Sequence, residues 1–225
     1  MKYPIYIVDA EKDSRIQLNR MLSQADWSCR PFRSGADLIN EIEALEPGVV
    51  LADVRNASFN GLDLIESISK INFALPIIAM AKMADTSVVV AAMRSGAVDF
   101  LQMPVRSETL EKAIEGAAPI VDQRIRIVDQ TKRDKARIEV LSPRELEVLQ
   151  ALANGEANAM ISRNFDISIR TVETHRANII RKIGLSNIVG AIAVFQRYEA
   201  ACSLHADPNR LLRQIEAWRD LTVTG

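Results

Sequence analysis

Short apolar runs alternate with amphipathic stretches along the first half of the chain. The clearest runs cover residues 5–8, 49–52, 77–80 and 100–101, and a weaker one covers residues 29–32. Short runs of this kind, separated by helical patterns, are typical of the strands of a parallel sheet. We therefore predict an α/β fold built on a five-stranded parallel sheet.

The stretches between these runs have the apolar spacing of helices. Residues 16–25 and 88–95 repeat apolar side chains at helical intervals. Helices that connect parallel strands pack on both faces of the sheet, which gives a doubly wound fold. Ligands of such folds bind at the carboxyl ends of the strands, and the residues at these positions are Asp9, Asp53, Ala81 and Met103.

The chain after residue 110 has the pattern of a long helix. Apolar residues follow in alternating steps of four and three, at Leu110, Ile114, Ala117, Val121 and Val128. Arg124 interrupts this seam, and Pro119 is expected to kink the helix or restart it. The pattern leaves two interpretations open: a linker helix that pairs with a second chain, or a helix that only covers the sheet and is followed by a solvated linker.

A second, all-helical region begins near residue 138. Ser142, Pro143 and Glu145 have the spacing of a helix N-cap, a first-turn proline and a capping box. Ser168 and Ser186 are further candidate caps, and four helices are predicted over residues 142–154, 158–165, 168–183 and 186–199. After them the chain has an amphipathic stripe of Leu211, Leu212, Ile215 and Trp218.

Length and charge support two domains with different partners. At 225 residues the chain can bury two modest cores. Residues 1–120 carry 12 Lys and Arg against 16 Asp and Glu, whereas residues 121–225 carry 16 against 13. The slight basic excess is weak support for nucleic-acid binding. The predicted segments are an α/β domain 1–118, a linker helix 119–137, a helical domain 138–199 and a helical tail 200–225.

Neither the cysteines nor the apolar runs indicate a secreted or membrane protein. Cys29 and Cys202 lack the spacing of a disulfide framework or a zinc site. Every apolar run is shorter than the roughly 20 residues that span a bilayer. We expect a cytoplasmic protein without a membrane partner. We also do not expect an enzyme, because no nucleophile, base and orienting residue form a recognisable catalytic set.

Two acids follow predicted strands at the edge where a ligand is expected. Asp9 and Asp53 are expected to lie side by side, where paired carboxylates can weakly hold a divalent cation such as Mg²⁺. Residues 3–118 resemble the receiver domain of response regulators through Ile7-Val8-Asp9-Ala10-Glu11, Ala52-Asp53-Val54-Arg55, Gly61, Gly96-Ala97-Val98-Asp99-Phe100 and Pro104. The resemblance implies that Asp53 is the phosphoacceptor and that magnesium binds beside it.

Three positions of this acidic site depart from the receiver pattern. The family has a second acid after the first strand, a hydroxyl residue after the fourth and a lysine after the fifth, whereas this chain has Ala10, Ala81 and Met103. Phosphoryl transfer depends on positioned charges, so the site is predicted to be degenerate. Glu11 is a partial substitute for the missing acid, which leaves a residual acidic pocket of Asp9, Glu11 and Asp53. No cofactor is expected beyond a weakened Mg²⁺ site.

Residues 158–177 have the pattern of a helix-turn-helix. At 100° per residue, one face of the second helix is apolar, with Val172, Ile179 and Ile183. The opposite face is formed by Arg170, Thr174, Ala177 and Arg181. The apolar face is expected to pack on the core, which leaves the opposite face free for the major groove of DNA.

The polar side chains of this helix divide by the DNA groups they suit. Carboxylates accept from cytosine, Asn pairs with adenine and small apolar side chains meet thymine methyl groups, so the base-reading candidates are Glu173, Asn178 and Ala177. The phosphate-binding candidates are Ser168, Arg170, Thr171, Arg181 and Lys182. Arg176 falls toward the buried side, so its long stem is expected to cross the core edge and bring its guanidinium to a phosphate.

The same region resembles the LuxR-type helix-turn-helix. The resemblance rests on Leu141-Ser142-Pro143-Arg144-Glu145, Val148-Leu149, Gly155, Ile161, Ser168 and Arg170-Thr171-Val172-Glu173-Thr174-His175-Arg176-Ala177-Asn178-Ile179. With the receiver-like half before it, the layout to about residue 199 resembles FixJ/NarL-type response regulators, which bind DNA as dimers and act on transcription. Ala159 departs from the pattern, because many members have a basic residue there.

We therefore predict a sequence-specific DNA-binding transcriptional regulator of the two-component response-regulator type. Its predicted partners are double-stranded DNA and a second copy of the chain. Its control is predicted to be independent of ordinary aspartyl phosphorylation and to come from dimerisation, a ligand or a partner. Two alternatives stay open: a switch in which a histidine kinase or another signalling partner acts on Asp53, and an interaction protein that no longer binds DNA.

Overall fold

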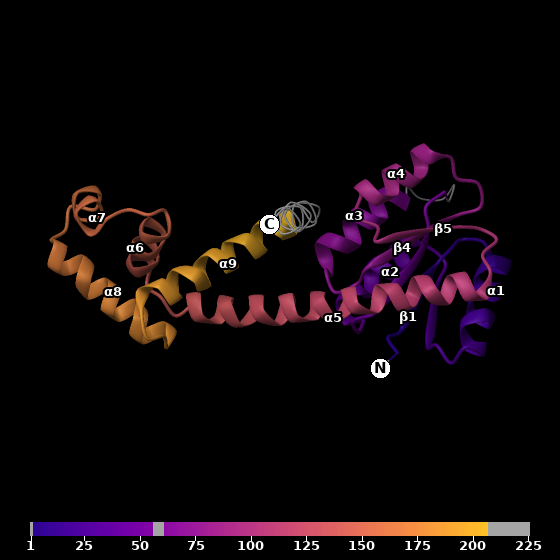
Figure 1. The fold of residues 1–225 in the computed structure, drawn as a ribbon, viewed down its shortest axis with the longest axis horizontal. Coiled ribbons are helices and arrows are strands. Elements are labelled where there is room, and N and C mark those ends of the chain that lie inside the picture. The colour runs from indigo at the N-terminus through magenta and orange to yellow at the C-terminus, as the bar shows by residue number, and fades with distance from the viewer. Residues whose placement is uncertain (1, 56–60, 207–225) are drawn as a thin grey trace, which may run out of the picture. The chain divides into compact units, whose positions relative to one another are not determined.

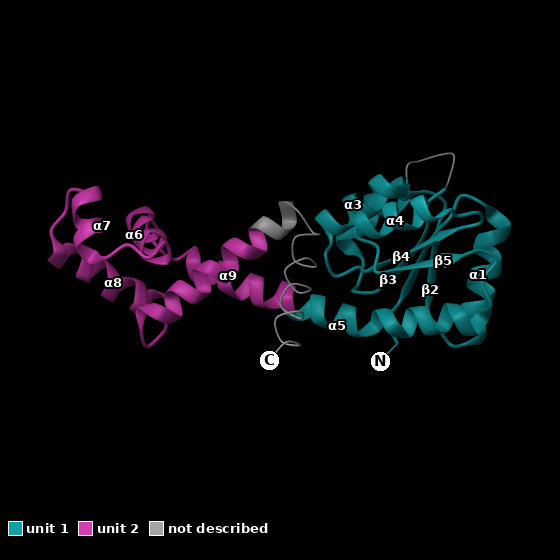
Figure 2. Ribbon diagram, turned by 45° about the horizontal axis from the view of Figure 1, so that its top comes forward, with its two compact units in different colours: residues 1–126, 204–225 teal, residues 127–203 magenta. Residues whose placement is uncertain are grey.

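The computed structural model describes residues 2–55 and 61–206, with the backbone alone for residues 203–206. It divides into two compact units, one within Met1–Arg126 and the other Ile127–Ser203 (Figure 2). Each unit has buried apolar clusters of its own and is described by itself. The stripe predicted over residues 211–218 lies outside the described residues.

The first unit is built on a parallel sheet, as predicted (Figure 1). Within the described residues the sheet has five strands in the order β2-β1-β3-β4-β5, which are β1 Ile5–Val8, β2 Cys29–Phe32, β3 Val49–Asp53, β4 Ile77–Ala81 and β5 Asp99–Gln102. The register pairs Val8 with Ala52 and Asp53 with Met80. The carboxyl ends of the three central strands therefore lie together at one edge.

Helices cover both faces of this sheet, which confirms the doubly wound fold. The helices of the first unit are α1 Lys12–Gln24, α2 Gly35–Glu41, the short 3₁₀ helix η1 Ile42–Ala44, α3 Gly61–Ile71, α4 Thr86–Arg94 and the first turns of α5 Ser107–Ile138. One core holds Leu38, Ile65 and Ala92, from α2, α3 and α4. The core on the opposite face holds Leu18 of α1 and Ile114 of α5.

The helix α5 continues through Pro119, so the predicted restart of the helix at this residue is wrong. A proline removes the hydrogen bond to the carbonyl four residues earlier, here Glu115. Both residues are exposed, so water can solvate the freed carbonyl and the helix is not forced to end. Residues 122–137 are consequently helical.

The predicted seam of α5 faces the sheet of its own unit up to Val121. Arg124, which breaks the seam, is buried and stacks 4.6 Å from the centre of the Phe73 ring. Its Nη1 donates to the Phe73 carbonyl at 3.2 Å, and burial lowers the pKa of the guanidinium to about 10. This part of the seam matches the interpretation in which the helix covers the sheet.

The second unit is all-helical, as predicted. Its helices in residues 143–206 are α6 Pro143–Ala153, α7 Asn158–Asn164, α8 Ile169–Ile183 and α9 Ile188–Ala206. Their shared core includes Val148, Ile161, Ile179 and Phe195. No single helix in the described ranges is long and apolar enough to cross a membrane, and α8 with Ile188–Cys202 meets that test only as a pair bent by 68°.

The caps of these helices follow the predicted chemistry at two of three starts. The Ser142 capping box of α6 is formed, and the Ser168 Oγ accepts from the Thr171 N–H at 3.0 Å at the start of α8. The prediction of Ser186 as the cap of the last helix is wrong. Asn187 takes this role, because its Oδ1 accepts from the Gly190 N–H at 2.8 Å.

A buried carboxylate joins the end of α5 to α9 within the second unit. Asp134 is 1% exposed, and Arg197 donates to it from Nε at 2.9 Å and from Nη2 at 3.2 Å. Gln130 donates to the same carboxylate at 2.9 Å. A buried charge needs such partners because desolvation alone would disfavour it. The last turns of α5 therefore belong to the second unit.

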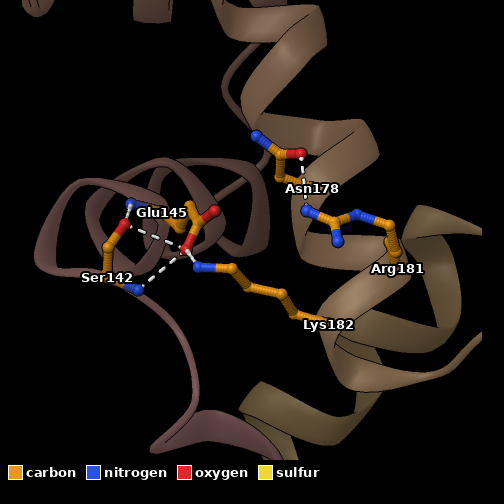
Figure 3. A network of polar contacts seen from close by, with 5 residues as sticks. All are labelled: Ser142, Glu145, Asn178, Arg181 and Lys182. Carbon is orange, nitrogen blue, oxygen red and sulfur yellow. Dashed lines mark hydrogen bonds and ion pairs between the residues drawn. The ribbon is translucent and has the colours of Figure 1, made fainter.

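Glu145 connects the start of α6 to the end of α8 (Figure 3). It is 4% exposed, and its Oε2 accepts from the Ser142 N–H at 2.8 Å and from the Lys182 Nζ at 2.7 Å. Burial alone would raise the pKa of the Glu145 carboxyl, but the bonds from Lys182 and Ser142 outweigh it and hold the pKa below its ordinary value. The network therefore needs the charged carboxylate.

We predict that Glu145→Gln lowers the free energy of unfolding of the second unit by about 1–2 kcal/mol at neutral pH, because it weakens the cap and removes the anion facing Lys182. The folded-state pKa is lowered, so this stability is present above the unfolded-state pKa and is lost as the pH falls through the folded-state value. Urea unfolding of the full chain, followed by circular dichroism at several pH values, measures the difference.

Glu147→Gln is the matched control for this prediction. Glu147 lies on the same helix and pairs with Arg144 at 2.7 Å, but its side chain is half exposed. Exposed pairs contribute little, so this variant is expected to stay within about 0.5 kcal/mol of the natural protein. Equal losses in both variants, or a Glu145→Gln loss that persists at low pH, would contradict the assignment.

Candidate DNA interface and acidic pocket

The structure brings the two predicted acids together at the carboxyl edge of the sheet. Asp9 directly follows β1, and Asp53 is the last residue of β3. Because Val8 pairs with Ala52, the two carboxyl groups leave neighbouring strands at the same level. Asp9 is 4% exposed, and its Oδ1 accepts from the Glu11 N–H at 2.7 Å. The Asp53 Oδ1 accepts from the Arg55 N–H at 3.1 Å.

The pocket carries excess negative charge. Burial raises the pKa of Asp53, and the neighbouring charges of Asp9 and Glu11 raise it further. The Arg55 N–H and the Lys82 ammonium act in the opposite direction, but the net shift is upward. The ionised form of Asp53 is therefore less favoured than that of a free aspartate, and any cation that comes close stabilises it.

Ala10, Ala81 and Met103 place no polar side-chain group in this pocket. Ala10 is exposed, and Ala81 is buried at the end of β4. Met103 follows β5, donates its N–H to the Ala81 carbonyl at 2.8 Å and packs its side chain against the apolar core under α1 and α5. None of these side chains can donate to a phosphoryl oxygen, and Ala10 supplies no carboxylate oxygen.

Lys82 is a pocket residue that the sequence patterns did not single out. It comes directly after β4, and its Nζ donates to the Glu11 Oε2. This hydrogen bond raises the pKa of the Lys82 ammonium, and the charges of Asp9 and Asp53 add to the effect. Its position next to Ala81 is the signal that could have found it, because residues after a parallel strand line the ligand edge.

The residues present do not fit a magnesium ion well. Mg²⁺ prefers several oxygen ligands in octahedral geometry, but one expected acid is Ala10 and the substitute acid Glu11 is bound by Lys82. Over residues 2–55 and 61–202, no three His, Cys, Asp or Glu side chains are grouped so that they could hold a metal ion.

The second candidate site is the exposed face of α8. Val172, Ile179 and Ile183 are buried in the core of the second unit, on the predicted apolar face. Arg170, Thr174, Ala177 and Arg181 are all exposed, as the helical spacing predicts. Glu173 and Ser168 are exposed beside them, whereas Thr171 and Asn178 are half-buried.

Hydrogen bonds and a ring contact hold the turn before α8, which sets the direction of this helix within its unit. Asp166 has a φ of 51°, in the left-handed region that few residues other than glycine adopt. The Ser162 Oγ donates to the Ile167 carbonyl at 2.5 Å. Arg144 of α6 donates to the Phe165 carbonyl at 2.8 Å and stacks 4.4 Å from its ring centre. The turn is thus bound to both α6 and α7.

Several predicted DNA-binding residues also have partners inside the unit. The Arg176 Nη1 donates to the Asn158 Oδ1 at 2.8 Å, which ties α8 to the first residue of α7. The Arg181 Nη2 donates to the Asn178 Oδ1 at 3.3 Å, and Lys182 binds Glu145 (Figure 3). Thr174 donates its hydroxyl to the Arg170 carbonyl at 2.9 Å. The pairing of Lys182 with Glu145 was not predicted, because helical spacing within α8 gives no sign of a contact with α6.

Two family models match the chain, one in each half. Residues 5–115 match the response regulator receiver domain. Residues 139–195 match the luxR family of bacterial regulatory proteins. The first match contains the acidic pocket, and the second contains α8 and the turn before it.

Relatives and solved structures share both halves. The chain is 31% identical to the transcriptional regulatory protein FixJ of Bradyrhizobium diazoefficiens, with 86% of this chain and 94% of FixJ covered. It is 30% identical to the transcriptional regulatory protein TdiR of Thauera aromatica, with 88% of each covered. The full-length FixJ structure from B. japonicum aligns with a TM-score of 0.53 at 30% identity, covering 89% of this chain and 98% of that one. The response regulator StyR aligns with a TM-score of 0.62 at 25% identity, covering 88% and 100%.

The identity and coverage of these relatives are high enough to assign the chain to their family. The arrangement of the two halves agrees with this assignment, because the five-stranded parallel sheet precedes the helix-turn-helix unit. The chain therefore belongs to the FixJ-type response regulators and is a DNA-binding transcriptional regulator, not an enzyme, with a receiver domain followed by a LuxR-type helix-turn-helix.

Proposed function

We propose that this regulator binds specific double-stranded DNA sites as a homodimer and inserts α8 of each copy into the major groove. The observation that carries the proposal is the exposed polar face of α8 beside a hydrogen-bonded turn. Recognition helices of helix-turn-helix proteins use such a face, and dimers place the two helices about one DNA turn apart. Since its ligand is bacterial DNA, we place the protein in the cytoplasm.

We assign base reading and phosphate binding to different side chains of α8. Glu173, Ala177 and Asn178 are the base-reading residues. The phosphate-binding residues are Ser168, Arg170, Thr171, Arg176, Arg181 and Lys182, and Thr174 is a further DNA-binding residue on the same face. The bonds of Arg176 and Lys182 within the unit orient these two side chains, and an ammonium or guanidinium group has further hydrogens to donate.

We further propose that control does not depend on ordinary phosphorylation of Asp53. The support comes from Ala10, Ala81 and Met103, which supply none of the groups that stabilise a phosphoryl group. Dimerisation, a ligand or a partner would then act on the receiver domain. The boundaries we propose are 1–118 for the receiver domain, 119–137 for the linker helix, 138–199 for the DNA-binding domain and 200–225 for a helical tail. The retention of Asp53 favours one alternative, a switch operated by a histidine kinase.

We predict that Arg170→Ala weakens binding to every DNA sequence about equally, by about tenfold, and lowers the slope of log affinity against log salt by about one. Glu173→Ala is instead expected to relax the preference at one base pair, by about 1–3 kcal/mol. Fluorescence anisotropy with a selected site and single-base variants of it measures both effects. Arg20→Ala, an exposed arginine of α1, is the control and should leave affinity unchanged.

Charge reversal gives the sharper test of the DNA interface. Combining Arg170→Glu with Arg181→Glu should abolish site-specific binding, because two phosphate contacts become repulsive. The Arg20→Glu variant changes charge outside the second unit and should still bind. If the double variant occupies the same promoters as the natural protein, the chain is an interaction protein and α8 is not its DNA contact.

We predict that purified protein treated with acetyl phosphate and Mg²⁺ does not accumulate a stable phosphoryl adduct. The pocket lacks the hydroxyl residue after β4, the lysine after β5 and the second acid after β1 that stabilise the transferred group. Restoring them with Ala10→Asp, Ala81→Thr and Met103→Lys together should allow an adduct, and adding Asp53→Ala should remove it. Intact-mass spectrometry measures the adduct. An adduct on the natural protein that is lost in Asp53→Ala would establish the phosphorylation switch instead.

A further inference from the structure

We propose that the Lys82 ammonium group is a built-in cation of the acidic pocket and excludes a divalent cation from it. The inference goes beyond the proposed phosphorylation-independent control and can be tested separately from it, because it concerns the affinity of the pocket for a divalent cation and not the phosphorylation of Asp53. It assigns to Lys82 a positioning and charge-balancing role. No catalysis is attributed to this residue.

The position of Lys82 is set by the sheet. Asp53 pairs with Met80 in the register of β3 and β4, and the Val54 N–H donates to the Met80 carbonyl at 2.9 Å. On the other side, the Met103 N–H donates to the Ala81 carbonyl at 2.8 Å. The residue after Ala81 is thereby held between β3 and β5 at the edge where the acids lie. The main chain of Lys82, from which its side chain extends, is therefore positioned by the sheet.

Lys82 differs from the nearby arginines in the group to which it donates its hydrogen bond. Two arginines approach the pocket, but each directs its guanidinium to a main-chain carbonyl: Arg15 to Asp9 at 2.5 Å and Arg55 to Met83 at 2.5 Å. Lys82 donates to a carboxylate of the pocket, Glu11. Its charge also acts on Asp53, where it opposes the effects of burial and of the neighbouring acids.

The ion pair between Lys82 and Glu11 is too exposed to contribute much to the stability of the fold. The Lys82 and Glu11 side chains are 61% and 49% exposed, and pairs in that environment contribute little to folding. The pair does, however, affect the binding of a divalent cation in the pocket. Glu11 is the acid that would replace the carboxylate missing at Ala10, and Lys82 binds it. An incoming divalent cation must therefore displace the ammonium group and then remain close to its positive charge.

The size of the effect follows from simple electrostatics. A divalent cation next to a unit positive charge, at the spacing of neighbouring side chains in water, loses about tenfold in affinity. Salt reduces this value, because both charges are near the surface. Removal of Lys82 should therefore strengthen divalent-cation binding, because it removes a positive charge and frees the Glu11 carboxylate as a ligand.

Manganese titration of the full-length protein tests the proposal, with free Mn²⁺ measured by electron paramagnetic resonance. Lys82→Ala should bind Mn²⁺ about tenfold more tightly than the natural protein at low salt, and Lys82→Gln should do the same. Lys70→Ala is the matched control, because Lys70 is an exposed lysine of α3 that pairs with Glu66 at 3.8 Å. Adding Glu11→Gln to Lys82→Ala should remove most of the gain.

The outcomes separate this inference from the proposed function. Unchanged or weaker Mn²⁺ binding in both Lys82 variants overturns the inference, and so does the absence of measurable binding in every protein. Tighter binding supports it even if the natural protein proves to be phosphorylated on Asp53, a result that would overturn only the proposed control. If Lys82→Ala loses both Mn²⁺ binding and a phosphoryl adduct, Lys82 supports that chemistry and the inference is wrong.

Discussion

The parallel register of β1, β3 and β4 is the constraint on which the first unit depends. These strands are buried on both faces, so a slip of one residue would move side chains shaped for one core into the other. The register therefore holds Asp9, Asp53 and Lys82 at one edge, whatever chemistry they perform. The packing of the sheet keeps Asp53 next to Asp9, although burial and the neighbouring acids disfavour the charge of Asp53, and Lys82, directly after β4, lies beside them.

The second unit positions α8 by different means. Its direction is set by the turn before it, by the bond between Arg176 and Asn158, and by the contact of Lys182 with the capping box of α6. Asp134 ties the end of α5 into the same unit through Arg197. The direction of α8 thus depends on the core and the polar contacts of its own unit. This helix does not need the chemistry of the acidic pocket to be correctly oriented.

Much of the fold was predictable because periodicity reports burial directly. The strands and helices follow from their apolar spacing, and Ser142 and Ser168 mark helix starts because their side chains satisfy free N–H groups. Pro119 and Asn187 were harder, since continuation through a proline and the choice between adjacent caps depend on solvent access and local geometry. The length of α9 beyond residue 199 also has no strong stop signal.

The residues of the two candidate sites also divide into those that the sequence predicts and those that only the structure shows. The exposed face of α8 and the pairing of Asp9 with Asp53 follow from helical spacing and strand order. The sequence patterns do not mark Lys82, because the receiver pattern is broken at Ala81 and the charged residue is the one directly after it. The contact between Lys182 and Glu145 joins residues far apart in sequence, so only the packing of α6 against α8 shows it.

The central claim is that site-specific DNA binding is independent of phosphorylation at Asp53. A genome-wide DNA-binding selection with purified full-length protein tests it directly, run with and without magnesium plus a phosphoryl donor and repeated with Asp53→Ala. We predict the same set of enriched sites with similar affinity in every condition. Enrichment that requires the donor and is abolished by Asp53→Ala would contradict it.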